Sequence, residues 1–390
     1  MRRWMAFPLA VAVATGLIHH ETPRVSAQPK AGPVAESFRT ADGVELHGLF
    51  HATNKNPSGA PVVVFLYPPG PDRDMTKGDW AGLATMLNDA GYHVFQFDWR
   101  GHGKSTSIRD PQKFWGNPYL NGKGSNFNAI IKGGPPVKMP LKNDLFYKDL
   151  GTRADRYLPV YLNDLAAVRF HLDAKNDKGG LNTGSIYLVG AGDAATIGMA
   201  WLTTEWNRPA TMPNVNQLGI GVATYQVVPQ DLIGGISSEA GADFGGAVWL
   251  TATRPQSVPP TLIKKWVSAP NMAPKMRDNN PMLFLYAEKD NMGPQSGKMQ
   301  GSFFYNEVLV AEPKKGTPLA KLDQTFLREV KGAQKLQGMK LLGQNATLKT
   351  EDTIIQYFTA IQKVRQSIAP KSRDFKEPYF VNPASFGFAP

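Results

Sequence analysis

Short runs of apolar residues, mostly β-branched or aromatic, recur along the chain and predict buried β-strands. The runs span residues 62–66, 93–97, 185–189, 247–250, 282–286 and 326–330. Between them, apolar residues return every three or four positions, which predicts helices over residues 80–90, 158–172, 197–204 and 354–364. Strands that alternate with helices predict an α/β protein with a doubly wound, mostly parallel sheet.

The segments outside this alternation predict the remaining organisation of the chain. Residues 35–40 and 44–51 flank the turn-forming triplet Ala-Asp-Gly and predict an antiparallel hairpin. Residues 107–156 and 207–246 are too long for simple connections. The first follows the fourth predicted strand, and ligands of such sheets bind outside the carboxyl ends of strands. We therefore expect 107–156 to be a cap-like insertion over a pocket.

The N-terminus has the pattern of a secretory signal peptide. Arg2 and Arg3 precede an apolar stretch over residues 4–18 and a polar segment that ends in Val-Ser-Ala at 25–27. The apolar stretch is shorter than the about 20 residues of a membrane span. We predict cleavage after Ala27 and a secreted or periplasmic protein that is not integral to a membrane, with an uncleaved anchor as the alternative. Residues 28–370 are then one domain, and 371–390 an extended tail.

Composition narrows the possible chemistry. The chain lacks cysteine, which excludes disulfides, thiolate metal sites and a cysteine nucleophile. Its seven histidines show no ligand spacing with carboxylates, so we expect no metal, and no cofactor is indicated. Lys and Arg total 43 against 32 Asp and Glu, which favours an anionic neighbour without indicating specific nucleic-acid binding.

Three strings at predicted strand ends carry a family resemblance: DWRGHGKS at 98–105, LVGAGDAA at 188–195 and LYAEKD at 285–290. With the order of elements, they make the chain similar to the α/β-hydrolase superfamily, especially its lysophospholipase and serine-aminopeptidase-like members. The resemblance covers most of residues 35–365 and implies the α/β-hydrolase fold. It also implies positions for a nucleophile, an acid, a histidine base and oxyanion donors.

Those positions hold the wrong residues for serine hydrolase chemistry. The nucleophile of G-x-S-x-G is replaced by Gly192, while the acid position keeps Asp290. No histidine follows His171, and the nearest candidate, Gln337, hydrogen-bonds but is no general base near neutral pH. The orphaned Asp290 is then expected to cap a loop.

The predicted oxyanion loop is also altered. It reads Tyr-Pro-Pro-Gly at 67–70, so the donor position is Pro69, which has no N–H, followed by Gly70. The second donor is the N–H of Asp193, beside that residue's own carboxylate.

Two alternatives stay open at this turn. Asp193 is a substitute nucleophile if the elbow shifts by one residue, or else the N-cap of a helix that begins at Ala194. The same string fits the dinucleotide fingerprint as Gly190, Gly192 and Ala195, although no acidic residue stands where the next strand would end.

The sequence as a whole predicts an exported pseudo-hydrolase that binds a ligand and is not an enzyme. The alternative is an esterase-like or peptidase-like hydrolase with rearranged groups such as Asp193. Residues 107–156 carry nine Lys or Arg and four Asp, interleaved with aromatic residues. We expect Tyr67, Trp115 and Tyr119 to contact an anionic or carbohydrate ligand of the cell envelope. Alternatively, the insertion is a solvated basic loop anchored by its aromatic residues.

Overall fold

A computed structural model describes residues 32–116, 127–131, 141–211, 226–227, 239–255, 258–267, 272–290, 293–310 and 324–388. The predicted signal peptide, residues 1–27, lies outside the described residues, so its cleavage stays a prediction.

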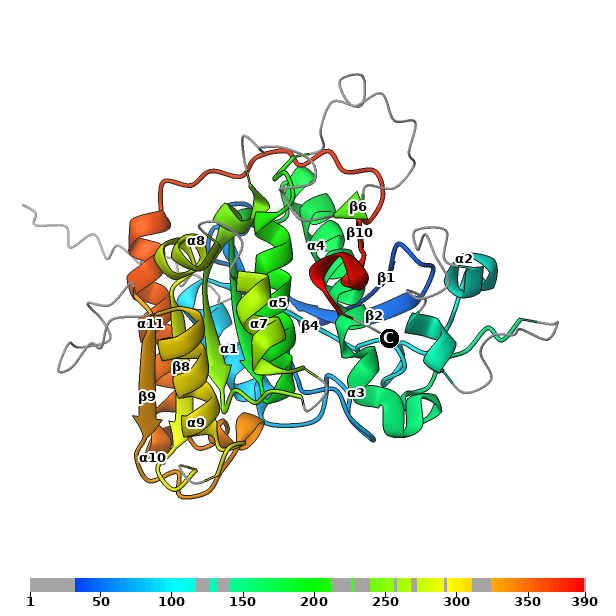
Figure 1. The fold of residues 1–390 in the computed structure, drawn as a ribbon. Coiled ribbons are helices and arrows are strands. Elements are labelled where there is room, and N and C mark those ends of the chain that lie inside the picture. The colour runs from blue at the N-terminus through cyan, green and yellow to red at the C-terminus, as the bar shows by residue number, and fades with distance from the viewer. Residues whose placement is uncertain are drawn as a thin grey trace, which may run out of the picture. The chain divides into compact units, whose positions relative to one another are not determined.

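The core of the fold is an eight-stranded sheet (Figure 1) with the order β1-β2-β4-β3-β5-β7-β8-β9. Its strands are Val34–Arg39, Glu45–His51, His93–Phe97, Pro61–Leu66, Asn182–Ala191, Phe244–Leu250, Met282–Ala287 and Phe326–Val330, in that spatial order. β2 pairs antiparallel with β1 and β4, and the strands from β4 to β9 are parallel. This order is that of the α/β-hydrolase fold, so the predicted doubly wound sheet and the N-terminal hairpin are confirmed.

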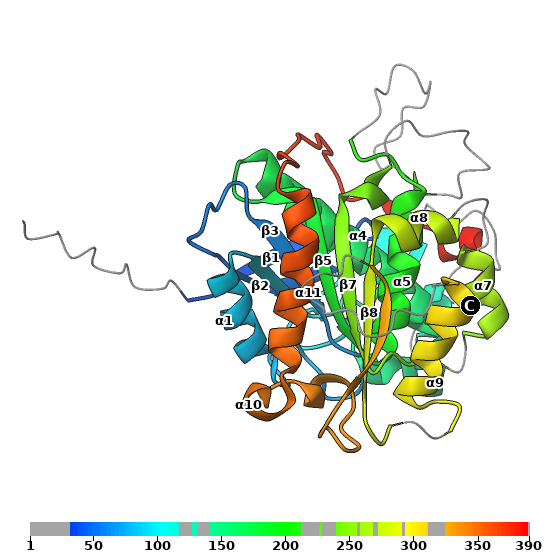
Figure 2. The same ribbon diagram turned by 90° about the vertical axis from the view of Figure 1, so that its left-hand side faces the viewer.

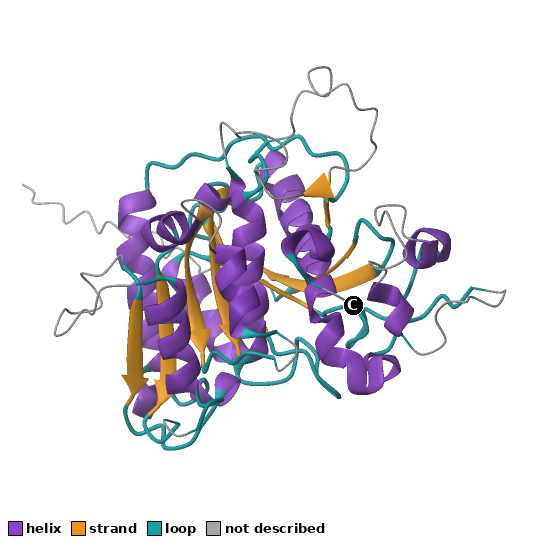
Figure 3. Ribbon diagram, in the orientation of Figure 1, coloured by secondary structure: helices purple, strands orange, loops and turns teal. Residues whose placement is uncertain are grey.

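Helices cover both faces of the sheet (Figures 2 and 3). On one face lie α1, Trp80–Ala90, and α11, Thr350–Arg365. The other face carries α4, α5, α8 and α9, at Leu162–Asp177, Asp193–Trp206, Met272–Asn279 and Gly297–Ser302, with α7, Pro260–Val267, packed on α5. Every residue of β3, β4, β5, β7 and β8 is buried, as expected for strands covered twice. None of the described helices has the length and hydropathy needed to cross a bilayer.

The described parts of the insertion 107–156 are short helices. They are α2 at Pro111–Gly116, 3-10 helices at Phe127–Ile130 and Tyr147–Arg153, and α3 at Ala154–Tyr157. The insertion begins against the β1–β2 turn, where the N–H of Arg109 donates to the carbonyl of Gly43 at 2.8 Å. α10, Asn345–Leu348, precedes α11 at the carboxyl edge of the sheet.

The C-terminal tail is held to α4 and α5 by a buried ionic network. Arg169 of α4 contacts Asp173 and Asp243, and Arg373 of the tail donates to the second oxygen of Asp243 at 3.0 Å. Farther along, the Tyr379 hydroxyl donates to Glu205 of α5. A short parallel bridge between β10, Phe380–Val381, and β6, Gln226–Val227, continues the attachment.

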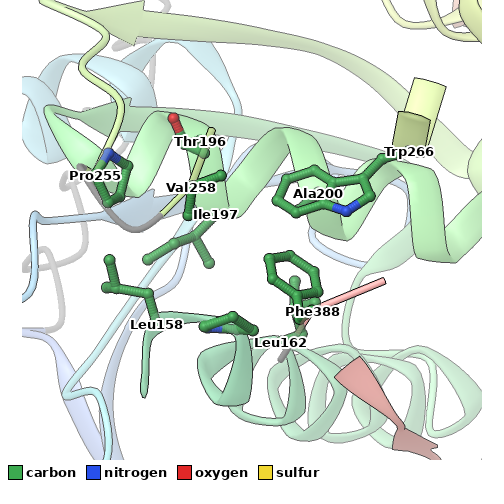
Figure 4. Close-up of a pocket in the computed structure, with 10 residues that line it drawn as sticks. Leu158, Leu162, Thr196, Ile197, Ala200, Pro255, Val258, Trp266 and Phe388 are labelled. Carbon is green, nitrogen blue, oxygen red and sulfur yellow. The ribbon is translucent and has the colours of Figure 1, made fainter. Parts of the chain in front are cut away.

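Phe388 then closes a small apolar pocket between α4, α5 and α7 (Figure 4), and its ring centroid lies 4.2 Å from that of Trp266. The pocket is walled mainly by Leu158, Leu162, Ile197, Ala200 and Val258. The tail predicted at 371–390 is therefore extended but integral to the packing over its described part.

Arg373→Met tests the anchoring of the tail. Arg373 is 1% exposed, and its loss leaves the hydroxyl of Thr183 without a buried partner and Asp243 with Arg169 as its remaining ion-pair partner. We expect a loss of about 1.5–3 kcal/mol in the free energy of unfolding, measured by urea denaturation. Lys376→Ala, in the same tail, removes only an exposed pair with Asp374 and is the control, with no measurable change expected. Equal effects of the two substitutions would contradict this role for Arg373.

Candidate functional site

The turn between β5 and α5 is the geometric centre of the site. Gly192 has φ 55° and ψ −132°, in a region of positive φ that favours glycine. Its N–H donates to the carbonyl of Leu250 at 3.1 Å, and its carbonyl accepts from the N–H of Thr253 at 3.2 Å. A Cβ built on Gly192 would lie 3.3 Å from Cβ of Pro68 and 3.6 Å from Oγ1 of Thr253. A side chain at this position would therefore project between the loops that follow β3 and β7.

That position opens on a hollow of about 260 Å³ at the carboxyl edge of the sheet. Its lining comes from the loops after β3, β5, β7 and β9, and consists of Pro68, Arg73, Gly192, Asp193, Thr251, Thr253, Gln337, Gly338, Met339 and Lys340. Ligands of open α/β sheets bind at this edge.

Asp290 and Gln337 lie in contact, as expected for the acid and histidine positions that the family resemblance implies. Nε2 of Gln337 donates to Oδ1 of Asp290 at 2.8 Å. The other carboxylate oxygen accepts the N–H of Gly297, the first residue of α9, at 3.0 Å. Asp290 is 6% exposed, so both bonds serve a buried acceptor. The bond to Gly297 ties Asp290 to the start of α9.

The loop after β3 directs no N–H of its predicted donor positions at the hollow. Pro69 has none, and the N–H of Gly70 donates to Nε2 of His102 at 3.0 Å. Nδ1 of His102 lies 3.0 Å from the carbonyl oxygen of Arg100. Burial lowers the pKa of His102 to about 4, so its imidazole is neutral near pH 7: Nδ1 donates to the carbonyl of Arg100, and Nε2 accepts the N–H of Gly70.

The residues around His102 are fixed by a buried ion pair. The guanidinium of Arg100 contacts Asp42 of the β1–β2 turn at 2.7 Å and Asp164 of α4 at 2.6 Å. His102 thus braces the turn after β4 and holds the β3 loop in place.

The predicted N-cap role of Asp193 is wrong. α5 begins at Asp193 itself, with Gly192 at the N-cap, and no side chain caps the helix. Oδ1 of Asp193 instead accepts the hydroxyl of Thr253 at 2.5 Å, because the φ of Gly192 turns the following side chain toward the β7 loop. Burial raises the pKa of Asp193. Among the predicted oxyanion positions, only Asp193 lines the hollow.

Tyr67 and Trp115 are not placed to contact a ligand in the hollow. Tyr67 is 2% exposed, and its hydroxyl accepts the N–H of Trp99 at 3.2 Å. Trp115 is 4% exposed and donates its indole N–H to the carbonyl of Lys142 at 2.7 Å. Both rings are anchored in the protein's interior, and Tyr119 lies outside the described residues.

Tyr147 of the insertion is half-buried, and burial together with the nearby carboxylates of Asp155 and Asp193 raises its pKa. Tyr147 is not among the residues that line the hollow.

Sequence reasoning missed Arg73, Lys340 and Thr251. The two cations lie in loops without periodicity or motif, so no pattern marks them. Thr251 directly follows the apolar run at 247–250, and its position at the end of a predicted strand was the available signal. It adopts φ 48°, which is rare for a β-branched residue, and its buried hydroxyl has no hydrogen-bond partner in the described structure.

The glycines of the dinucleotide fingerprint have packing roles. A Cβ on Gly190 would lie 2.7 Å from the ring of Trp249 on β7, so a side chain would not fit there. Over the part of the chain that the structure describes, no cluster of His, Asp or Glu is arranged to hold a metal ion.

No protein-family model matches the sequence, and no curated protein matches it. Solved structures of similar fold include an esterase of Pyrococcus furiosus, at 11% identity and TM-score 0.44, with 84% of this chain and 90% of that chain covered. A fungal esterase of Rhizomucor miehei has the same identity and TM-score, with 86% of each chain covered. Esterase B of Lactobacillus rhamnosis also matches at 11% identity and TM-score 0.44, over 86% of this chain and 88% of that chain. At this distance the likenesses carry no information on reaction or substrate, and the fold assignment stands on the strand order.

Gly192→Ala tests the turn. Alanine would be forced into positive φ with its Cβ against Pro68, so we expect a loss of about 1–3 kcal/mol in the free energy of unfolding. Gly82→Ala, on the exposed side of α1 with open space at its Cβ position, is the control and should stabilise by about 0.5–1 kcal/mol. Urea denaturation measures both, and an unaffected Gly192→Ala variant would show that the turn is not under this constraint.

Proposed function

We propose that this chain is a lysophospholipase-like α/β-hydrolase-fold protein whose catalytic triad is lost and which binds a small ligand in the hollow over Gly192. The observation that carries the proposal is the bond from Gln337 to Asp290. The amide Nε2 donates at 2.8 Å to the acid that would orient a histidine, and an amide does not take up a proton near neutral pH.

The other parts of serine hydrolase chemistry support the same proposal. Gly192 supplies no hydroxyl at the elbow, and the N–H of Gly70 is bonded to His102. Loss of one oxyanion donor alone costs about 2.7–4 kcal/mol of transition-state stabilisation. Because nucleophile, base and donor belong to separate loops, one local change does not account for all of these differences.

The chemistry of the hollow's lining supports a binding site. It combines cationic, hydroxyl and amide groups from separate loops with the apolar surface of Pro68 and Met339. Such convergence of a few polar groups on a concave surface is the usual composition of a ligand site.

A hydrolase with rearranged groups is the second candidate, and Asp193 is the observation that favours it. Asp193 lines the hollow, and one carboxylate oxygen is bonded to Thr253. Burial raises its pKa, however, which disfavours the ionised form that a nucleophile needs. An aspartyl ester would also need a base to activate water, and the described lining holds no histidine.

Ester turnover tests the proposal. The folded protein should hydrolyse p-nitrophenyl acetate and butyrate no faster than buffer does, because no activated nucleophile faces the hollow. Gly192→Ser should behave alike, since its hydroxyl would lie near Pro68 and Thr253 without a base. Release of p-nitrophenol at 405 nm is the measurement, with circular dichroism to establish folding.

The outcomes separate the two candidates. Saturable turnover by the natural protein that disappears in Asp193→Asn would favour the rearranged hydrolase. Turnover gained in Gly192→Ser would reveal a base that the proposal does not contain.

A further inference from the structure

The hollow over Gly192 has an excess of positive charge. Arg73 and Lys340 both line it, and neither forms an ion pair with a described carboxylate. Their backbones are fixed in tight turns, with the N–H of Arg73 donating to Gly70 and that of Lys340 to Gln337. Cations on the wall of a concave surface attract an anionic group.

Asp193 is the acidic residue of the lining, and it only partly offsets this charge. Its Oδ1 already accepts the hydroxyl of Thr253, and burial raises its pKa. The carboxylate of Asp290 is bonded to Gln337 and Gly297, and that of Asp155 is not part of the lining.

The hydrogen-bond acceptors of the hollow complement a hydroxylated molecule. Because Nε2 of Gln337 is bonded to Asp290, its side chain presents the carbonyl oxygen as an acceptor. The second oxygen of Asp193 is another acceptor. Both suit hydroxyl donors of a ligand rather than further anionic oxygens.

Thr251 gives an independent sign of a binding site. Its φ of 48° is strained for a β-branched residue, and its hydroxyl, in the hollow's wall, lacks a hydrogen-bond partner in the described structure. Strained backbone of this kind persists where surrounding structure enforces it and clusters at ligand sites.

The volume limits the ligand. About 260 Å³ is at the lower end of the range for small-molecule sites. It accommodates one monosaccharide-sized molecule or the end of a longer one.

We propose that the hollow binds a small hydroxylated acid, such as a sugar acid, with its anionic group between Arg73 and Lys340 and its hydroxyls on Asp193 and Gln337. The proposal rests on the proposed non-hydrolytic function, because it assigns a ligand class to the same hollow. The anionic group of this ligand is either a carboxylate or a phosphate ester, and the experiment below distinguishes the two.

Isothermal titration calorimetry with the folded natural protein tests the ligand class. The probes are glucuronate, galacturonate and glucose 6-phosphate, with glucose and the methyl ester of glucuronate as neutral counterparts. We expect at least one anionic probe to bind at millimolar concentration or below, and about tenfold more tightly than its neutral counterpart. Binding should weaken as salt is raised, since the cations are exposed. Preference for uronates or for glucose 6-phosphate identifies the anionic group.

Substitutions locate the binding. Arg73→Gln and Lys340→Gln should each weaken the anionic probe by about threefold to tenfold and leave its neutral counterpart unchanged. Lys178→Gln is the matched control, because Lys178 is exposed at the end of α4, at the opposite edge of the sheet. It should bind as the natural protein does.

The proposal is overturned if no anionic probe binds, if neutral and anionic probes bind equally, or if Lys178→Gln weakens binding as much as Arg73→Gln. These failures concern ligand class and leave the absence of hydrolysis in place. Enzymatic release of glucuronate from its methyl ester would instead contradict the proposed function itself.

Discussion

The left-handed turn at Gly192 is the constraint on which the arrangement of the site depends. Its N–H is bonded to Leu250, the last residue of β7, and its carbonyl to Thr253 in the loop that follows, so the end of β5 and the start of α5 are fixed relative to that neighbouring strand. In a serine hydrolase this turn is strained by its nucleophile. Glycine adopts the same dihedral angles at little steric cost, so here the turn persists without the side chain that would use it.

The hydrogen bond from Gln337 to Asp290 keeps a buried carboxylate of the site satisfied. A buried carboxylate that loses its hydrogen-bond partner is costly, by more than the about 1–3 kcal/mol of an uncharged group. Gln337 supplies an N–H to Asp290 at 2.8 Å, and in the proposed function it stands in the position of the family's histidine. His102 plays a comparable role for the β3 loop, since its neutral imidazole accepts the N–H of Gly70. The altered residues thus keep hydrogen bonds that support the fold while lacking proton-transfer capacity.

Local pattern predicted the scaffold because the strands are runs rich in apolar residues, separated by helical periods. The strands His93–Phe97 and Phe326–Val330 have the predicted bounds. Side-chain direction was harder to predict, because it depends on contacts from distant segments. Asp193 faces Thr253 instead of capping its own helix.

The aromatic residues and the cations of the site were missed for the same reason. Trp115 was expected at a ligand, but its N–H is satisfied within the insertion by Lys142. Arg73 and Lys340 meet in one hollow only because the loops after β3 and β9 converge there. No spacing in the sequence encodes that convergence.

Intact-mass spectrometry after incubation with a fluorophosphonate tests the central claim most directly, because the reagent bonds covalently only to an activated nucleophile. The account predicts that the folded protein keeps its unmodified mass, while an active serine hydrolase treated in parallel gains one adduct. A stoichiometric adduct on this protein, mapped by peptide sequencing to a residue that lines the hollow, would contradict the account.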